Sequence, residues 1–188
     1  MSRAFDRVTL ETGRLVLRPL REDDAAALFA MFSDPRVVRY TSTPPWESID
    51  VAHQRIADDR RELAAGEHLR LGVVLRDGGP IVGTCSVYQL HEESRRAELG
   101  YALAVHAQGR GLMHEALTAV LDWAFGPLEL HRVEADADPR NAPSVRTLER
   151  LGFAREGLLR ERWIVAGEVQ DSVMYGLLAR EWQARRTR

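Results

Sequence analysis

The chain has 188 residues, which is enough for one domain with a sizeable core, so a single unit spanning residues 1–188 is expected. Its apolar fraction of 45% and charged fraction of 29% are ordinary for a soluble globular protein. No segment approaches the run of about 20 apolar residues that crosses a bilayer, so no membrane partner is expected. A net charge of -2 provides no overall basic field for nucleic acid, which disfavours an electrostatic nucleic-acid binder, so no direct nucleic-acid partner is expected.

The cysteine and histidine content limits which kinds of site the chain can form. The one cysteine, Cys85, stands in an apolar stretch and is expected to be a small buried hydrophobe. The six histidines are scattered without metal-ligand spacing, so no metal site is predicted. The N-terminal segment from Met1 to Leu10 lacks the layout of a secretory signal. Together these observations favour a cytoplasmic protein.

The first third of the chain predicts one strand and two helices. The apolar alternation of LVLRPL, from Leu15 to Leu20, indicates a strand, and the acidic run at 22–24 starts a helix over AAALFAMF. Pro35 and the segment 41–45 interrupt the pattern, which leaves 40–46 as a loop between helices. A longer helix is then expected from about Ser48 to Ala65, with Gly66 as its C-terminal cap.

The remainder alternates between strand and helix patterns. The stretches LRLGVVL, IVGTCSVYQL and AELGYALAV, joined by turns, predict an antiparallel meander that starts at Leu69. The later predicted elements are a helix over 111–125, a strand over HRVEADA, a helix over 141–151, two strands over 153–164 and 169–177, and a short tail. The expected fold is α+β, a mixed and mostly antiparallel sheet of about seven strands with helices on both faces.

The segment 102–116 carries the most specific signal. A buried strand runs through Gly109-Arg110-Gly111 into an apolar helix. A helix N-terminus leaves about four N–H groups unpaired, and glycines let the backbone approach a ligand, so this loop can bind an anion such as a phosphate. The alternative is a tight turn whose glycines only relieve crowding. His114 replaces the third glycine of a dinucleotide fingerprint and the chain has no lysine for a Walker A loop, so both of those readings fail.

The chain resembles the GNAT superfamily of N-acetyltransferases. The family's cofactor loop, Q/R-x-x-G-x-G/A, is matched by residues 106–111, with His106 at the first position. A closer similarity to the RimJ/RimL-type subgroup rests on AELGYAL, GRGLMHEAL, HRVEADADPRNAPSVRTLERLGF, REGLLRERW and the late D-x-x-x-Y-x-L-L-x-x-E-W. It extends roughly from Arg14 to Trp182, which is nearly the whole chain.

The resemblance implies acetyl-CoA as cosubstrate and a sheet that splays open between its fourth and fifth predicted strands, the first ending at Val105 and the second starting near His131. Pantetheine would lie in that gap, and the pyrophosphate would bind the glycine loop. The residues that the resemblance implies for cofactor binding are Leu103, Ala104, Val105, Gln108, Gly109, Arg110, Gly111, Leu112, Met113 and Asn141.

Acetyl transfer to an amine needs a base, because only the neutral amine attacks. Glu98 is the candidate, since it lies in the apolar strand AELGYALAV where partial desolvation would raise its pKa. The alternative is a structural carboxylate that pairs with Arg95, Arg96 or Arg132.

The leaving group needs stabilisation as well. Leu148 stands where many GNAT enzymes have a tyrosine acid, so the resemblance points instead to Ser144 as the group near the cofactor sulfur. Asn141 is a natural helix N-cap, a role that is compatible with binding pantetheine. Ser144 can equally be a first-turn serine that assists this cap.

The resemblance favours a protein N-terminal amine, of the ribosomal-protein type, as acceptor. A small amine such as an antibiotic, a polyamine or an amino acid is the enzymatic alternative, and a non-catalytic acyl-CoA-binding module is an alternative of another class. Aromatic residues in the segment 40–46 and near Trp163 flank the implied acceptor groove. A homodimer is compatible with the resemblance.

Overall fold

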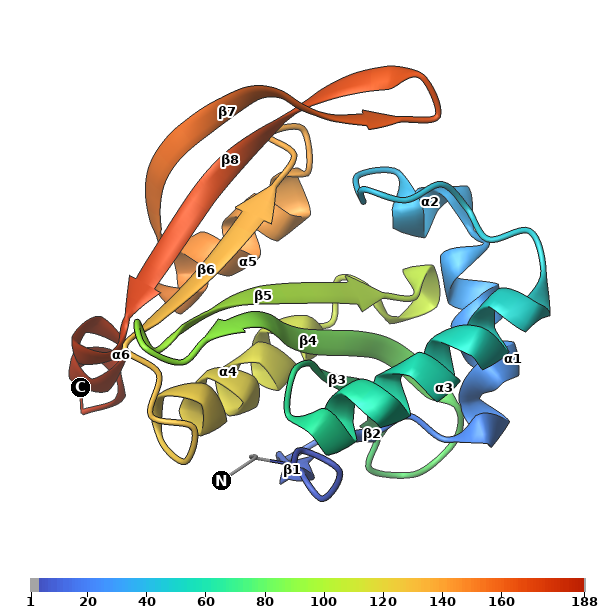
Figure 1. Cartoon of the computed structure of the whole chain (residues 1–188), viewed down its shortest axis with the longest axis horizontal. Coiled ribbons are helices and arrows are strands. Elements are labelled where there is room, and N and C mark those ends of the chain that lie inside the picture. The colour runs from blue at the N-terminus through green and yellow to red at the C-terminus, as the bar shows by residue number, and fades with distance from the viewer. Residues whose placement is uncertain (1–3, 188) are drawn as a thin grey trace.

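A computed structural model describes residues 4–187, so Met1 to Arg3 at the start of the predicted N-terminal segment lie outside it. The sheet has eight strands in the order β1-β2-β3-β4-β5-β6-β8-β7, and every neighbouring pair is antiparallel except β5 and β6 (Figure 1). The strands are β1 (Leu10–Glu11), β2 (Leu15–Pro19), β3 (Leu69–Leu75), β4 (Ile81–His91), β5 (Arg96–Leu103), β6 (Arg132–Ala137), β7 (Ala154–Val165) and β8 (Glu168–Leu178). The predicted α+β fold is confirmed, with the two-residue β1 as an additional edge strand.

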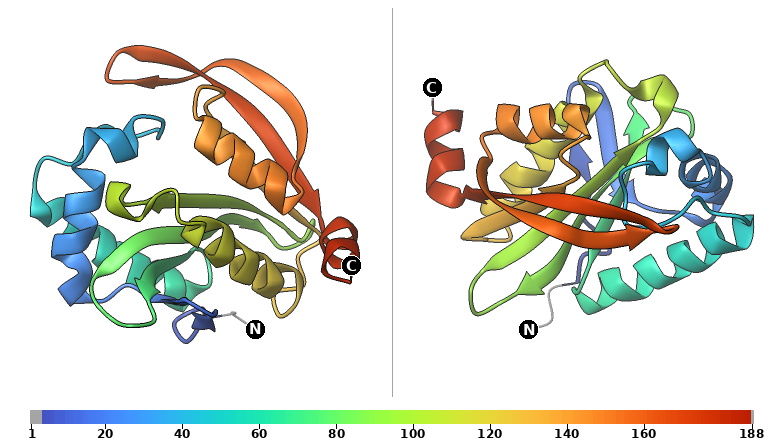
Figure 2. Two further views of the ribbon diagram at one scale, coloured as in Figure 1. Left: turned by 180° about the vertical axis from the view of Figure 1, so that it is seen from behind. Right: turned by 90° about the horizontal axis from the view of Figure 1, so that it is seen from above.

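Helices cover both faces of this sheet, as the two views of Figure 2 show. The α-helices are α1 (Ala25–Phe32), α2 (Pro35–Val38), α3 (Ile49–Ala65), α4 (Leu112–Phe125), α5 (Ala142–Leu151) and α6 (Ala179–Arg186). Helices α1 and α3 pack on one face, where Leu28 and Ile56 are fully buried. Helices α4 and α5 pack on the other, where α4 buries its broad apolar side. None of the helices between residues 4 and 187 combines the length and the apolar character that crossing a bilayer requires.

Local signals explain where the main helices begin and end. The hydroxyl of Ser48 accepts a hydrogen bond from the N–H of Asp50 at the start of α3, and Gly66 ends the helix with a φ of 73°. In α5 the side chain of Asn141 accepts from the N–H of Ser144, and Gly152 ends the helix with a φ of 97°. The caps predicted at Gly66 and Asn141 are confirmed.

Three boundary predictions were wrong. Pro35 does not break the chain but occupies the first turn of the short helix α2, where a missing N–H costs nothing. The predicted tail after 177 contains α6, whose Trp182 is buried and donates its indole N–H to Asp122 of α4 at 2.9 Å. The strand expected to end at Val105 ends at Leu103, because Val105 starts a single turn of 3-10 helix.

The sheet splits between β5 and β6. Only the segment Arg96–Glu98 of β5 pairs with Arg132–Glu134 of β6. Beyond Glu98 the two strands diverge, β5 staying with β4 and β6 staying with β8 (Figure 1). The splay predicted between these two strands is confirmed. Because residues 99–103 lack a strand partner on that side, the gap offers backbone groups to whatever enters it.

Candidate active site

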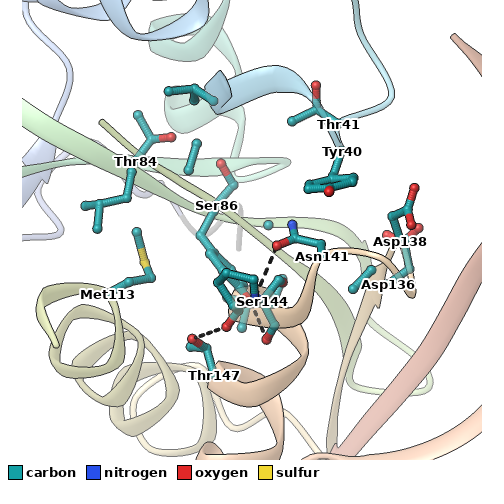
Figure 3. A pocket seen from close by; sticks show the side chains of 18 of the residues that line it. Tyr40, Thr41, Thr84, Ser86, Met113, Asp136, Asp138, Asn141, Ser144 and Thr147 are labelled. Carbon is teal, nitrogen blue, oxygen red and sulfur yellow. Dashed lines mark hydrogen bonds between the residues drawn. The ribbon is translucent and has the colours of Figure 1, made fainter. Parts of the chain in front are cut away.

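A cavity of about 800 Å³ lies at the split. Its walls come from β4, β5 and β6, the N-terminal turns of α4 and α5, the segment after α1, and the β7–β8 hairpin. Predicted site residues on this wall are Glu98, Leu103, Gln108, Gly109, Gly111, Leu112, Met113, Asn141 and Ser144. Ala104, Val105 and Arg110 do not line it, and the N–H of Ala104 is engaged by the carbonyl of Val82 at 2.9 Å. Figure 3 shows Ser144 and Asn141 on one wall, with Thr84, Ser86 and Met113 nearby.

The loop before α4 has the geometry of an anion site. Gly109 and Gly111 both adopt left-handed φ values, 73° and 72°, which a side chain would strain. No side chain caps α4, and its first internal hydrogen bond is from the N–H of Glu115 to the carbonyl of Gly111 at 3.2 Å. A Cβ added at Gly109 would meet no atom within 4 Å. The backbone at Gly109 therefore has room beside it for a ligand, and the start of a helix favours negative charge through its unpaired N–H groups and its dipole.

Contacts between distant residues hold this loop in place. Glu115 accepts the Thr12 hydroxyl at 2.6 Å and the backbone N–H of Arg14 at 2.9 Å. The Arg14 guanidinium pairs with Glu115 at 2.6 Å and donates to the carbonyl of Arg110 at 3.0 Å. The glycine loop is therefore tied to the segment between β1 and β2, which keeps its N–H groups in a fixed orientation.

Glu98 lies on β5 at the point where the sheet opens. Burial raises the pKa of its carboxyl, and the negative charge of Asp136 raises it further, against the opposing effects of Tyr88 and Arg162. Two of the three arginines proposed as structural partners, Arg96 and Arg132, are engaged elsewhere, since they pair with Glu134 at 3.2 and 2.7 Å. A half-buried carboxylate with a raised pKa is a stronger proton acceptor than an exposed one.

Asp136, which the sequence reasoning missed, faces the same cavity from β6 (Figure 3). Its Oδ2 accepts the hydroxyl of Ser172 at 2.6 Å and the indole N–H of Trp163 at 3.3 Å. Both bonds end on the same oxygen, so Oδ1 has neither of these donors. The alternation in HRVEADA places residues 134 and 136 on one face of the strand, and this was the available signal.

The opposite wall carries hydroxyl groups. The hydroxyl of Tyr101 lies 2.7 Å from Oγ of Ser144, and the N–H of Ser144 is bound by the Asn141 side chain at 3.3 Å. Leu148, one turn further along α5, is fully buried in the core. Successive strand residues point to opposite faces, so Tyr101 and Glu98 lie on different sides of the gap. A carboxyl group with a raised pKa and a pair of hydroxyl groups thus face one cavity from two sides.

The sequence of the chain matches the family model described as "Acetyltransferase (GNAT) domain" over residues 14–154. The chain belongs to the GNAT family of acetyltransferases. It is 34% identical over 174 residues to the uncharacterized N-acetyltransferase p20 of Bacillus licheniformis, covering 93% of this chain and 98% of that protein. It is 30% identical over 185 residues to the [Ribosomal protein uS5]-alanine N-acetyltransferase of Escherichia coli (strain K12), covering 94% and 93% of the two chains.

A solved structure agrees with this assignment. Mycobacterium smegmatis RimJ in complex with CoA-disulfide superposes with a TM-score of 0.80 at 29% identity, covering 93% of this chain and 87% of that one. GNAT acetyltransferases use acetyl-CoA, and the uncapped glycine turn before α4 fits the pyrophosphate of such a cofactor. The RimJ/RimL-type resemblance of this GNAT N-acetyltransferase is confirmed.

Other chemistry-bearing residues are placed away from this reaction. Cys85 is 1% exposed, its Sγ lies 3.6 Å from the sulfur of Met113, and burial raises the pKa of its thiol. Such a thiol is a core residue and a poor nucleophile. Within residues 4–187 no group of three or more His, Cys, Asp and Glu side chains is arranged to hold a metal ion.

Substituting Asp136 by asparagine should move the acid limb of the pH–rate profile of this GNAT enzyme to lower pH. The Asp136 charge helps to raise the pKa of Glu98, so its removal lowers that pKa and leaves more Glu98 ionised in acid. Steady-state kcat/KM for the amine, measured against pH, tests this. Asp171→Asn is the matched control, because Asp171 also lines the cavity but is bound by the N–H of Glu161 at 2.8 Å. Equal shifts in both variants would contradict a specific effect of the Asp136 charge on the pKa of Glu98.

Proposed function

We propose that this GNAT enzyme transfers the acetyl group of acetyl-CoA to the N-terminal amine of a protein, of the ribosomal-protein type, by direct attack. The observation that carries the proposal is the split in the sheet, which joins an anion-binding loop, a candidate base and a hydroxyl pair in one cavity. Direct transfer requires mainly that the two substrates be positioned together, and one cavity that contains all of these groups provides for that.

Different residues of the cavity bind the cofactor and accept the proton. The amides from Gln108 to Met113 bind the pyrophosphate, and the backbone at Leu103 with the side chain of Asn141 binds pantetheine. Glu98 receives the proton that the acceptor ammonium must lose, directly or through a water molecule. Acetyl-CoA supplies an activated acyl group as its thioester; the protein's part is to orient it and to accept the proton.

The acceptor enters on the face that carries Glu98 and Asp136. Tyr40, Thr41 and Trp163 line the outer part of the cavity, between the β7–β8 hairpin and the segment that follows α2. The similarity to a ribosomal-protein alanine N-acetyltransferase supports a peptide N-terminus as acceptor. The two carboxylates support the alternative acceptor, a small cationic amine such as a polyamine.

Thermal unfolding with and without acetyl-CoA tests the cofactor half of the proposal. A ligand at about 100 times its Kd stabilises the folded state by about 2.7 kcal/mol, so the melting temperature should rise clearly. An unchanged melting temperature at millimolar acetyl-CoA would contradict the assigned cofactor site.

Release of free CoA thiol tests the acceptor half. A peptide that begins with alanine should give turnover, and the same peptide with a blocked N-terminus should give none. Spermidine serves as the small-amine comparison. Turnover with spermidine alone would overturn the protein acceptor in favour of the small amine. Stabilisation by acetyl-CoA without release of CoA to any amine would contradict the proposed transfer and favour an acyl-CoA-binding module.

A further inference from the structure

Tyr101 links the two sides of the split sheet through Ser144. It lies on β5 beyond the last residue that pairs with β6, and its hydroxyl oxygen is 2.7 Å from Oγ of Ser144 in the first turn of α5. The same hydroxyl is 3.4 Å from the backbone carbonyl of Ser144. Both residues line the cavity, so this bridge crosses the gap on the side away from Glu98.

The direction of this hydrogen bond decides what Ser144 can do. If Ser144 donates to Tyr101, its hydroxyl proton is used and cannot reach the cavity. If Tyr101 donates to Oγ of Ser144, the serine proton is free to point at a ligand. Asn141 holds the N–H of Ser144 at 3.3 Å, so the serine is fixed relative to the helix start while its hydroxyl proton can rotate.

A negative charge arises in the cavity during the reaction. When the amine attacks, the C–S bond breaks and its electron pair goes to the coenzyme A sulfur, while the ammonium proton goes to Glu98. The thiolate would form near the N-terminus of α5, where the helix dipole favours an anion. Of the side chains on the next turn of α5, Leu148 is apolar and buried, and the Thr147 hydroxyl donates to the carbonyl of Pro143 at 2.9 Å.

We propose that Tyr101 is a positioning residue on the leaving-group side, whose hydroxyl donates to Oγ of Ser144 and thereby directs the serine hydroxyl to the sulfur. The inference rests on the proposed function and names the residue that prepares the same site for its leaving group. Burial raises the pKa of Tyr101, so the tyrosine keeps its proton throughout. Tyr101 therefore contributes a hydrogen bond and not a proton, and CoA leaves as a thiolate that solvent protonates after release.

The thiol of bound CoA provides a direct measurement that needs no acceptor amine. The ultraviolet absorbance of the thiolate is titrated against pH in the binary complexes of wild type, Tyr101→Phe, Ser144→Ala, Ser144→Thr and Thr147→Val. The thiolate should be stabilised in wild type and in Ser144→Thr. Tyr101→Phe should reduce the thiol ionisation constant about tenfold, as expected for one hydrogen bond to a charged group, and Ser144→Ala at least as much. Thr147→Val is the matched control and should resemble wild type.

Kinetics provide an independent readout. Tyr101→Phe should lower kcat about tenfold while KM for acetyl-CoA stays near the wild-type value, since the hydrogen bond strengthens only as charge develops on sulfur. The chain's own cysteine does not interfere with the titration, because burial raises the pKa of Cys85. Melting temperatures of the variants identify any loss of folding.

The role of Tyr101 and the acetyl transfer itself are tested by different results. A thiol ionisation and a kcat that are unchanged in folded Tyr101→Phe would overturn the role of Tyr101 and leave the acetyltransferase proposal intact. If Tyr101→Phe does not fold, Ser144→Ala decides, and wild-type behaviour of that variant overturns the inference equally. Failure of wild type to bind CoA would overturn the proposed cofactor site itself.

Discussion

Replacing Glu98 by glutamine should lower kcat about 10²- to 10⁴-fold, the range that a positioned general base contributes, with little change in acetyl-CoA binding. Glutamine is nearly isosteric with glutamate but cannot accept the ammonium proton. Glu98 lies at the mouth of the split and is not paired to Arg96 or Arg132, so its substitution breaks no ion pair with either. Single-turnover rates with saturating acetyl-CoA and amine measure the effect.

The rate of the wild type and that of Glu98→Gln should depend differently on pH. The active form has an ionised Glu98, so the wild-type rate should rise with pH through the raised pKa of that carboxyl. In Glu98→Gln the residual rate should lose this dependence and follow only the ionisation of the amine. Glu93→Gln is the matched control, since Glu93 is exposed in the β4–β5 turn, outside the cavity. If the Glu98→Gln rate stays within a few-fold of wild type, a group other than Glu98 accepts the ammonium proton.

Replacing Gly111 by glutamate should abolish the stabilisation by acetyl-CoA and reduce turnover to background. The residue has a φ of 72° and occupies the N-cap position of α4. A carboxylate there would bring negative charge to the turn that we propose binds pyrophosphate, and the new side chain would also be strained in this conformation. Thermal unfolding and isothermal titration with acetyl-CoA measure the loss.

The strain must be separated from the effect on binding. Gly78→Glu introduces the same side chain at a φ of 95° in a turn with no atom within 4 Å of the added Cβ, away from the cavity. It should lower the melting temperature by a similar amount yet retain the acetyl-CoA response. Gly111→Ala should bind acetyl-CoA more weakly than wild type but more tightly than Gly111→Glu. If folded Gly111→Glu binds acetyl-CoA with wild-type affinity, the glycine loop is not part of the cofactor site.

The fold was predictable where the local pattern and the tertiary contacts agree. Strands β2 to β8 and the helices α1, α3, α4 and α5 have clear periodicity, and two of those helices also have explicit caps. Helix α6 was missed because it buries only Trp182, so its sequence carries no apolar stripe. Its stability depends on contacts with distant residues, such as the bond from Arg185 to the carbonyl of Arg150 at 2.9 Å.

The candidate site was predictable only in part, for a related reason. Glu98 and the glycine loop stand within contiguous motifs whose chemistry the residue types suggest, and Ser144 stands in a motif that the family resemblance marks. Tyr101 and Asp136 acquire a possible role only because β5 and β6 separate, which places one beside α5 and the other opposite Glu98. The bond from Thr12 to Glu115 spans 103 positions, and no local pattern encodes it.

The split in the sheet also bears on self-association. A strand edge with unpaired N–H and C=O groups normally invites another chain to add a strand, and it thereby promotes aggregation. Here the open part of β5 lies between β4 and β6 in the sheet order, and not at the rim of the sheet (Figure 1). A second polypeptide strand would need room for side chains on both faces, whereas a slender amide-bearing molecule would not. The unpaired part of β5 can therefore bind a ligand, whereas a strand from another copy of the protein cannot pair with it.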